Sequence, residues 1–217
     1  MKKCRWLSPV VAGILLASAA PATATPITWA FTGTIDGNPY DQLHHLDGSV
    51  VDGTPFSGTY TFESTMTDDL PDDHTVGLYT QPVPPTSVMV LNVGNYTIIG
   101  WSDKIQVENR SKDWLALTSQ TFISDPIGLE SITISCEDIH GQVFVSDTLP
   151  LVPPPLEAFN GWSYLSVTGV WSGDPLLGSL GFGGPLSSLT PEPLSFLLIV
   201  GGVVAFTFRR PTRRFHS

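Results

Sequence analysis

The residues with the clearest capacity for chemistry form a short acidic segment at positions 68–74. Asp68, Asp69, Asp72 and Asp73 supply four carboxylates, and a histidine follows them directly. Carboxylate oxygens are the ligands that Ca²⁺ prefers, so this segment is a candidate calcium site. Its spacing lacks the alternating carboxylates, central glycine and terminal glutamate of an EF-hand loop. The alternative interpretation is a solvated acidic turn between two strands.

Tryptophans form a second group with a candidate binding role. An exposed indole ring stacks on the apolar face of a sugar, and Trp101, Trp114 and Trp162 are the candidates for such stacking. The competing interpretation is burial in the core, which is usual for large aromatic residues on alternating strands.

Motifs for catalysis are missing from the sequence. It contains neither a Gly-x-Ser-x-Gly nucleophile motif nor a His-Glu-x-x-His zinc motif. Acidic residues that could flank a glycosidic bond are numerous, but nothing in the sequence selects a facing pair. We therefore predict a protein that is not an enzyme and needs no cofactor, with calcium as a candidate ion.

The N-terminus has the three parts of a secretory signal peptide. Positive charges at Lys2, Lys3 and Arg5 precede an apolar stretch at residues 10–20 that is too short to anchor the chain. Ala22 and Ala24 then form a small-x-small cleavage site. We predict that residues 1–24 are a signal peptide, cut after Ala24 or, as second choice, after Ala22.

The C-terminus contains a breaker, a hydrophobic run and a cationic tail. Pro191, Glu192 and Pro193 precede residues 194–208, which carry no charge and include ten Leu, Ile, Val or Phe residues. As a helix, this run would span about 22 Å of a hydrocarbon core about 30 Å thick, so it predicts a short transmembrane segment. Four arginines in the tail, residues 209–217, favour a cytoplasmic end.

These three parts, in this order at the extreme C-terminus, resemble the PEP-CTERM sorting signal of Gram-negative bacteria. The resemblance implies that Pro191, Glu192 and Pro193 are a recognition site for an exosortase, a membrane protease or transpeptidase that removes the tail. It also implies export through the inner membrane, transient anchoring by residues 194–208, and a final location at the cell surface or outside the cell.

Removal of both ends would leave a strongly acidic domain. Residues 25–190 hold three basic and 19 acidic residues, a formal charge of −16, against −10 for the whole chain. Such a field repels nucleic acid and anionic lipid, so we expect no nucleic-acid partner. Cys136 would be the one remaining cysteine, and its place on an apolar strand face predicts burial.

Strand patterns fill residues 25–171. Apolar and polar residues alternate with a period of two in residues 27–35 and 56–63, with threonine on the polar side. Eight further strands are predicted at 76–79, 87–93, 96–101, 105–109, 114–119, 131–136, 143–146 and 163–171. Many short strands with close turns predict an antiparallel β-sandwich of jelly-roll-like topology. Residues 172–190 are rich in Gly, Pro and Ser and show no periodicity, so we interpret them as a linker to the sorting signal at 191–217.

Residues 29–36 and 53–62 also resemble a recurring PEP-CTERM cargo domain, although the match covers only part of the chain. The resemblance implies an association with exopolysaccharide and biofilm matrix, and it gives no reaction. We therefore expect a non-enzymatic protein of the cell surface or extracellular matrix. The alternatives are a carbohydrate-binding module that contacts polysaccharide and, less favoured, a secreted glycan-active enzyme.

Overall fold

The computed structural model describes residues 24–42, 44–81, 87–170 and 179–192, and within them the fold is almost entirely β. One short 3₁₀ helix, η1 (Leu156–Ala158), is the only helix in these ranges. The strands are β1 (Pro26–Thr34), β2 (Tyr40–Asp41), β3 (Pro55–Glu63), β4 (Val76–Thr80), β5 (Val88–Val93), β6 (Tyr96–Trp101), β7 (Lys104–Asn109), β8 (Asp113–Ser119), β9 (Phe122–Ser124), β10 (Ser131–Asp138), β11 (Trp162–Val170) and β12 (Ser179–Pro191). The predicted mainly-β class is confirmed.

Strands β1 and β3 show why the alternating pattern was informative. Trp29 and Phe31 of β1, with Tyr60 and Phe62 of β3, are fully buried, whereas the residues between them are partly or fully exposed. Successive strand residues point to opposite faces, so one face of this antiparallel pair lines the core and the other faces solvent.

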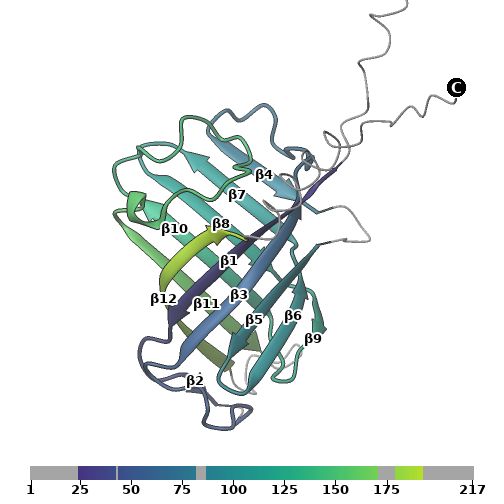
Figure 1. Ribbon diagram of the computed structural model, residues 1–217, viewed down its shortest axis with the longest axis vertical. Coiled ribbons are helices and arrows are strands. Elements are labelled where there is room, and N and C mark those ends of the chain that lie inside the picture. Colours follow the sequence, from purple (N-terminus) through teal and green to yellow (C-terminus); the bar gives the residue numbers. More distant parts are fainter. Residues whose placement is uncertain (1–23, 43, 82–86, 171–178, 193–217) are drawn as a thin grey trace, which may run out of the picture.

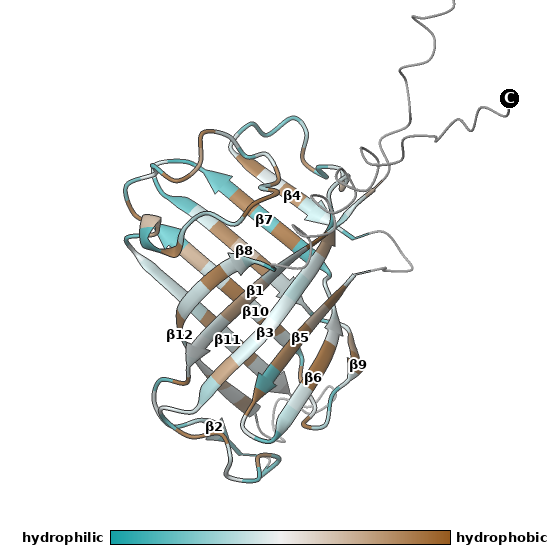
Figure 2. Cartoon of the chain, in the orientation of Figure 1, coloured by the Kyte–Doolittle hydropathy of each residue, from teal (hydrophilic) through white to brown (hydrophobic). Residues whose placement is uncertain are grey.

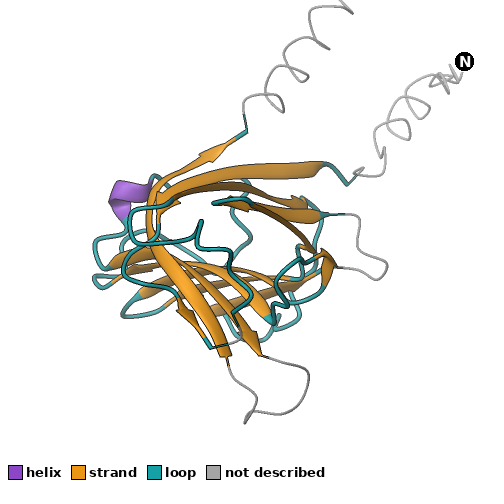
Figure 3. Ribbon diagram, turned by 90° about the horizontal axis from the view of Figure 1, so that it is seen from below, coloured by secondary structure: helices purple, strands orange, loops and turns teal. Residues whose placement is uncertain are grey.

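All twelve strands belong to one continuous antiparallel sheet. Its order is β4-β7-β8-β10-β11-β12-β1-β3-β5-β6-β9, with β2 paired to β12. The sheet folds over at β12, so that β4, β7, β8, β10 and β11 face β1, β3, β5 and β6 across the core (Figures 1 and 3). The structure thus differs from the expected pair of separate sheets, because a single strand serves both halves.

Strand β12 corrects the prediction of a linker at 172–190. Its first half pairs with β11, from Val170↔Ser179 to Tyr164↔Pro185, and its second half pairs with β1, from Gly33↔Leu186 to Trp29↔Pro191. The strand could not be predicted from the sequence because glycines interrupt the alternation of apolar and polar residues. The domain consequently extends past residue 171 to residue 192, while residues 171–178 lie outside the described ranges.

The strand predicted at 143–146 was also wrong. Residues 139–161 form a long loop that contains η1, and the backbone N–H groups of Val143 and Phe144 donate to Asp113 Oδ2 at 2.7 and 2.8 Å. These two N–H groups therefore find their hydrogen-bond acceptor in a carboxylate from β8 and not in a neighbouring strand. Besides β12, two strands went unpredicted, β2 and β9, which have only two and three residues.

Both chain ends of the domain leave from one end of the molecule, which we call the exit pole. Strand β1 begins there and β12 ends there, in register as Trp29↔Pro191, and the Glu192 N–H donates to Thr28 O at 3.0 Å. The loop 139–161 and the β7–β8 turn lie at the same pole, because β10 ends and β11 begins there (Figure 1). The far pole holds β2 and the turn between β1 and β3.

Side chains from both halves of the sheet build one hydrophobic core. The hydroxyl of Tyr60 on β3 crosses this core and donates to two carbonyl oxygens of the opposite half, Lys104 O at 2.9 Å and Thr118 O at 3.3 Å. Burial raises the pKa of Tyr60 above its ordinary value, so the phenol stays protonated and remains a donor.

Replacing Tyr60 with phenylalanine is expected to lower the free energy of unfolding by about 1–3 kcal/mol, because two buried carbonyl oxygens lose a donor. Urea denaturation of the Tyr60→Phe variant measures this loss. An unchanged unfolding midpoint would show that the bridge between the halves contributes nothing to stability.

A carboxylate network closes the far pole. Asp47 accepts hydrogen bonds from the Ser49 backbone N–H and from Asn95 Nδ2, each at 2.9 Å. These bonds, with a side-chain hydrogen bond from Ser49 as the largest cause, lower the pKa of Asp47 to about 2.

This shift predicts a loss of stability in acid. The folded-state pKa of Asp47 is depressed, so its contribution is present above pH about 4 and is lost as the pH falls towards 2. Asp47→Asn is therefore expected to weaken the dependence of the unfolding midpoint on pH between 4 and 2. Asp72→Asn, which removes a carboxylate from an exposed turn, controls for net charge, and equal pH profiles for the two variants would contradict the assignment.

Candidate functional site

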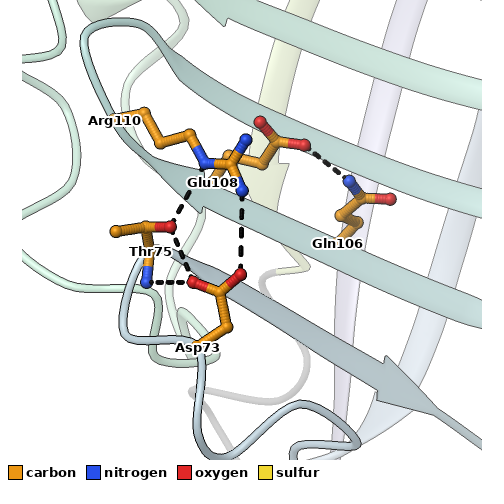
Figure 4. Close-up of polar contacts among 5 residues, drawn as sticks. All are labelled: Asp73, Thr75, Gln106, Glu108 and Arg110. Carbon is orange, nitrogen blue, oxygen red and sulfur yellow. Dashed lines mark hydrogen bonds and ion pairs between the residues drawn. The ribbon is translucent and has the colours of Figure 1, made fainter.

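The acidic segment 68–74 forms the turn before β4. Asp68 Oδ1 accepts hydrogen bonds from the backbone N–H groups of Leu70 and Leu78, both at 2.9 Å. Asp73 Oδ1 accepts from the Thr75 N–H at 2.9 Å and from its hydroxyl at 2.7 Å (Figure 4). Asp73 thus shapes the turn, and Asp68 accepts from a backbone N–H on the outer side of β4, which is an edge strand of the sheet.

Arg110 from the β7–β8 turn completes this arrangement. Its Nη2 lies 3.7 Å from Asp73 Oδ2, and its Nε donates to the Thr75 hydroxyl at 3.2 Å (Figure 4). The hydrogen bonds from Thr75, followed by the charge of Arg110, hold the pKa of Asp73 below its usual value.

These contacts argue against the predicted calcium site. Two of its four carboxylates are engaged in turn hydrogen bonds, and one of them faces a guanidinium. Across the described ranges, no three His, Cys, Asp or Glu side chains converge as a metal site would require. The solvated-turn alternative accounts for every contact that Asp68 and Asp73 make.

Two of the three predicted tryptophans meet on the outer face of the sheet. Trp114 of β8 and Trp162 of β11 are each in register with Glu137 of β10, the strand between them. Their ring centroids lie 5.2 Å apart at an angle of 87°, and Trp162 remains 40% exposed. Trp101 does not join them, because it lies on β6 in the other half of the sheet.

Glu137 supplies the polar centre of this aromatic row. Lys112 Nζ contacts Glu137 Oε1 at 2.7 Å, with side chains 60% and 13% exposed respectively. Hydrogen bonding from Lys112, and more weakly from the Trp162 indole, lowers the pKa of Glu137 and keeps the carboxylate charged. A half-exposed indole pair beside a fixed carboxylate and an ammonium group provides both a stacking surface and hydrogen-bonding groups for a sugar.

The neighbouring residues of β7 extend the row with polar groups. Glu108 is in register with Trp114, and Gln106 Nε2 donates to Glu108 Oε1 at 2.7 Å (Figure 4). Glu137, Glu108 and Gln106 are not predicted as site residues by the sequence alone. Period-two alternation would have placed Glu137 on the outer face of its strand, but the register that sets it between two tryptophans is set by pairing across strands.

Two buried aspartates, also missed from the sequence, hold the loop at the exit pole. Asp113 and Asp138 are both fully buried and in register on β8 and β10. Asp113 Oδ2 accepts the two loop N–H groups described above, and Asp138 accepts from the N–H groups of His140 at 3.0 Å and Gln142 at 2.6 Å. These bonds fix the loop across the end of the core.

Cys136 is buried, as its place on the strand predicted. Burial raises the pKa of its thiol to about 11, which removes the thiolate that nucleophilic chemistry requires.

The terminal signals lie partly outside the described ranges. Pro191 is the last residue of β12 and Glu192 follows it, whereas Pro193, the hydrophobic run 194–208 and the tail 209–217 are not described. Ala24 is exposed just before β1, and Ala22 is not described. Among the residues that are described, no helix is long and apolar enough to cross a membrane.

Comparisons with known proteins identify no relative: no family model, no curated protein and no solved structure matches the chain.

Proposed function

We propose that the chain is an exported, non-enzymatic β domain that is tethered to a membrane through its C-terminal run and then sorted to the cell surface or extracellular matrix. The position of its two ends supports this proposal most directly. Strand β1 begins and β12 ends side by side at the exit pole. Until the signal peptide is cut, a domain held by its N-terminal segment and by its C-terminal run presents both ends to the same membrane.

The sorting step we propose acts on residues 191–193, with an exosortase as the partner. Pro191 and Glu192 mark the point where the chain leaves the sheet, and the apolar run begins at Leu194. Proline at position 193 disfavours a helical Glu192, so a processing enzyme would meet an extended segment between the domain and the bilayer. No flexible linker of the length predicted from the sequence separates the two, because β12 occupies residues 179–191.

The matrix location is supported by charge and by the stacking surface. A formal charge of −16 over residues 25–190 favours solubility and disfavours nucleic acid and anionic surfaces. As fold type, we propose a jelly-roll-like sandwich, because the connections after β3, β4, β6, β8 and β9 pass between the facing halves of the sheet.

Cell fractionation tests this proposal. The full-length chain is expected in the membrane fraction when the sorting enzyme is absent, and at the surface or in the medium when it is present. A chain without residues 193–217 is expected in the periplasm or medium in both strains. Recovery of the full-length chain from the cytosol would contradict export, and equal processing with and without the enzyme would contradict sorting.

The Trp114–Glu137–Trp162 row favours a second candidate function, carbohydrate binding. The exposed ring of Trp162 supplies a stacking face, and Glu137, Glu108 and Gln106 supply polar groups in the adjacent register positions. A polysaccharide of the surrounding matrix is the corresponding ligand.

For this second candidate, Trp162→Ala is expected to weaken binding to a responsive glycan about tenfold, equivalent to about 1.4 kcal/mol. Trp101→Ala, on the other half of the sheet, is the matched control and is expected to bind as the unaltered chain does. A glycan array followed by titration measures both, and equal affinities for the two variants would remove the aromatic row as the site.

A further inference from the structure

The exit pole carries apolar side chains that the core does not use. Their exposed fractions are large for aliphatic residues: Ile139 is 45%, Val145 99%, Leu151 49% and Val152 65% exposed. All four lie in the loop 139–161, and Figure 2 shows hydrophobic stretches in the loops at this end of the molecule. Exposed apolar patches mark interaction surfaces, and this loop holds four of the exposed large aliphatic side chains of the described residues.

The loop is held in place, so these side chains are presented to solvent by a fixed backbone. Its inner side packs Phe144, Leu149 and Leu156 against the core. Asp113 binds the loop at residues 143 and 144, and the Tyr79 hydroxyl donates to Asp147 O at 2.9 Å. The loop therefore has one apolar side on the core and a second apolar set that faces outwards.

The course of the chain indicates what this second set faces. Only residue 193 separates Glu192 from the uncharged run that begins at Leu194. Two extended residues span about 7 Å, so a membrane that holds the run at 194–208 also lies close to the exit pole. The outward side of the loop at that pole then faces the bilayer.

Charges at the pole decide which lipid fits. The two exposed cations at the pole, Arg110 and Lys112, are paired with Asp73 and Glu137 respectively, so they leave no surplus of positive charge there. Asp69 and Asp72 in the exposed turn before β4, and Glu157 in the loop itself, add exposed negative charge that opposes an anionic surface. The balance favours zwitterionic headgroups, which carry no net negative charge.

We propose that the exit pole is a lipid-contacting surface, in which Val145, Leu151 and Val152 enter the headgroup region of a zwitterionic bilayer. This inference rests on the proposed membrane tether, and it adds a contact made by the folded domain itself.

Site-specific fluorescence on the full-length chain tests the contact. Cys4→Ser leaves Cys136 as the only native thiol, and its burial and raised pKa protect it from labelling. Val145→Cys then carries an environment-sensitive dye, and the chain is reconstituted into phosphatidylcholine vesicles with or without a nitroxide at the headgroup. Val51→Cys, 49% exposed in the turn before β3 at the far pole, is the matched control.

Three readouts separate this inference from the tether. We expect the protein to float with the vesicles, the dye at residue 145 to shift to the blue and to be quenched several-fold more than the dye at residue 51, and Leu151→Ser with Val152→Ser to reduce that quenching. Flotation with equal quenching at both positions would overturn the lipid contact and leave the tether standing. Failure to float would overturn both, and a blue shift at residue 145 without vesicles would identify a protein contact instead.

Discussion

A chain that ends at residue 178 is expected to lose cooperative folding, whereas a chain that ends at residue 192 is expected to retain it. The shorter chain lacks β12, which joins the two halves of the sheet. It also lacks four buried side chains, Leu180, Phe182, Leu186 and Leu189. At about 1.5–3 kcal/mol each, their burial contributes on the order of 6–12 kcal/mol, which is comparable to the whole stability of a domain at about 5–15 kcal/mol.

Near-ultraviolet circular dichroism and thermal unfolding compare the two chains. The matched pair differs only in residues 179–192, and both lack the hydrophobic run and the basic tail. A cooperative transition in the chain that ends at residue 178 would restore the linker interpretation and contradict the placement of β12.

Gly184→Ala is expected to destabilise the fold by about 3 kcal/mol, near the upper end of the usual cost of overpacking. A Cβ atom at this position would collide with the backbone carbonyl oxygen of Thr34. Backbone at the end of β1 cannot rotate away as a side chain can, so β12 would have to shift where it passes from β11 to β1.

Gly181→Ala is the matched control, three residues earlier on the same strand. Its nearest contact would be Val167 O at 3.8 Å, an ordinary van der Waals distance. We expect its unfolding midpoint in urea to stay within the range of ordinary surface substitutions. Equal destabilisation by the two substitutions would mean that strand propensity, and not close packing at residue 184, requires the glycine.

The strands that the sequence revealed are those whose alternation is built from side chains of contrasting polarity. Trp29 and Phe31 alternate with threonine, so the period of two is visible and β1 is predicted almost to the residue. In β12, Gly183 and Gly184 stand where the strand changes partners, and close approach to Leu165 and Thr34 requires glycine there. Tertiary packing requires these glycines, and the local sequence pattern does not reveal that requirement.

The candidate site likewise has features that residue types predict and features that depend on contacts between distant strands. The tryptophans could be named from their type, but the register that brings Trp114 and Trp162 together over Glu137 depends on pairing between strands that are far apart in sequence. The acidic turn was the densest cluster of ligands in the sequence, yet Asp68 and Asp73 bond to neighbouring backbone. Composition identifies ligand types, whereas only the folded chain shows which of them have other partners.

The measurement that tests the central claim most directly is the intact mass of the protein recovered from the culture medium. Our account predicts a chain that begins at Thr25 and ends before the hydrophobic run at 194–208, with β12 retained. A mass that still includes Arg213 and Arg214, or one that includes Met1, would contradict it.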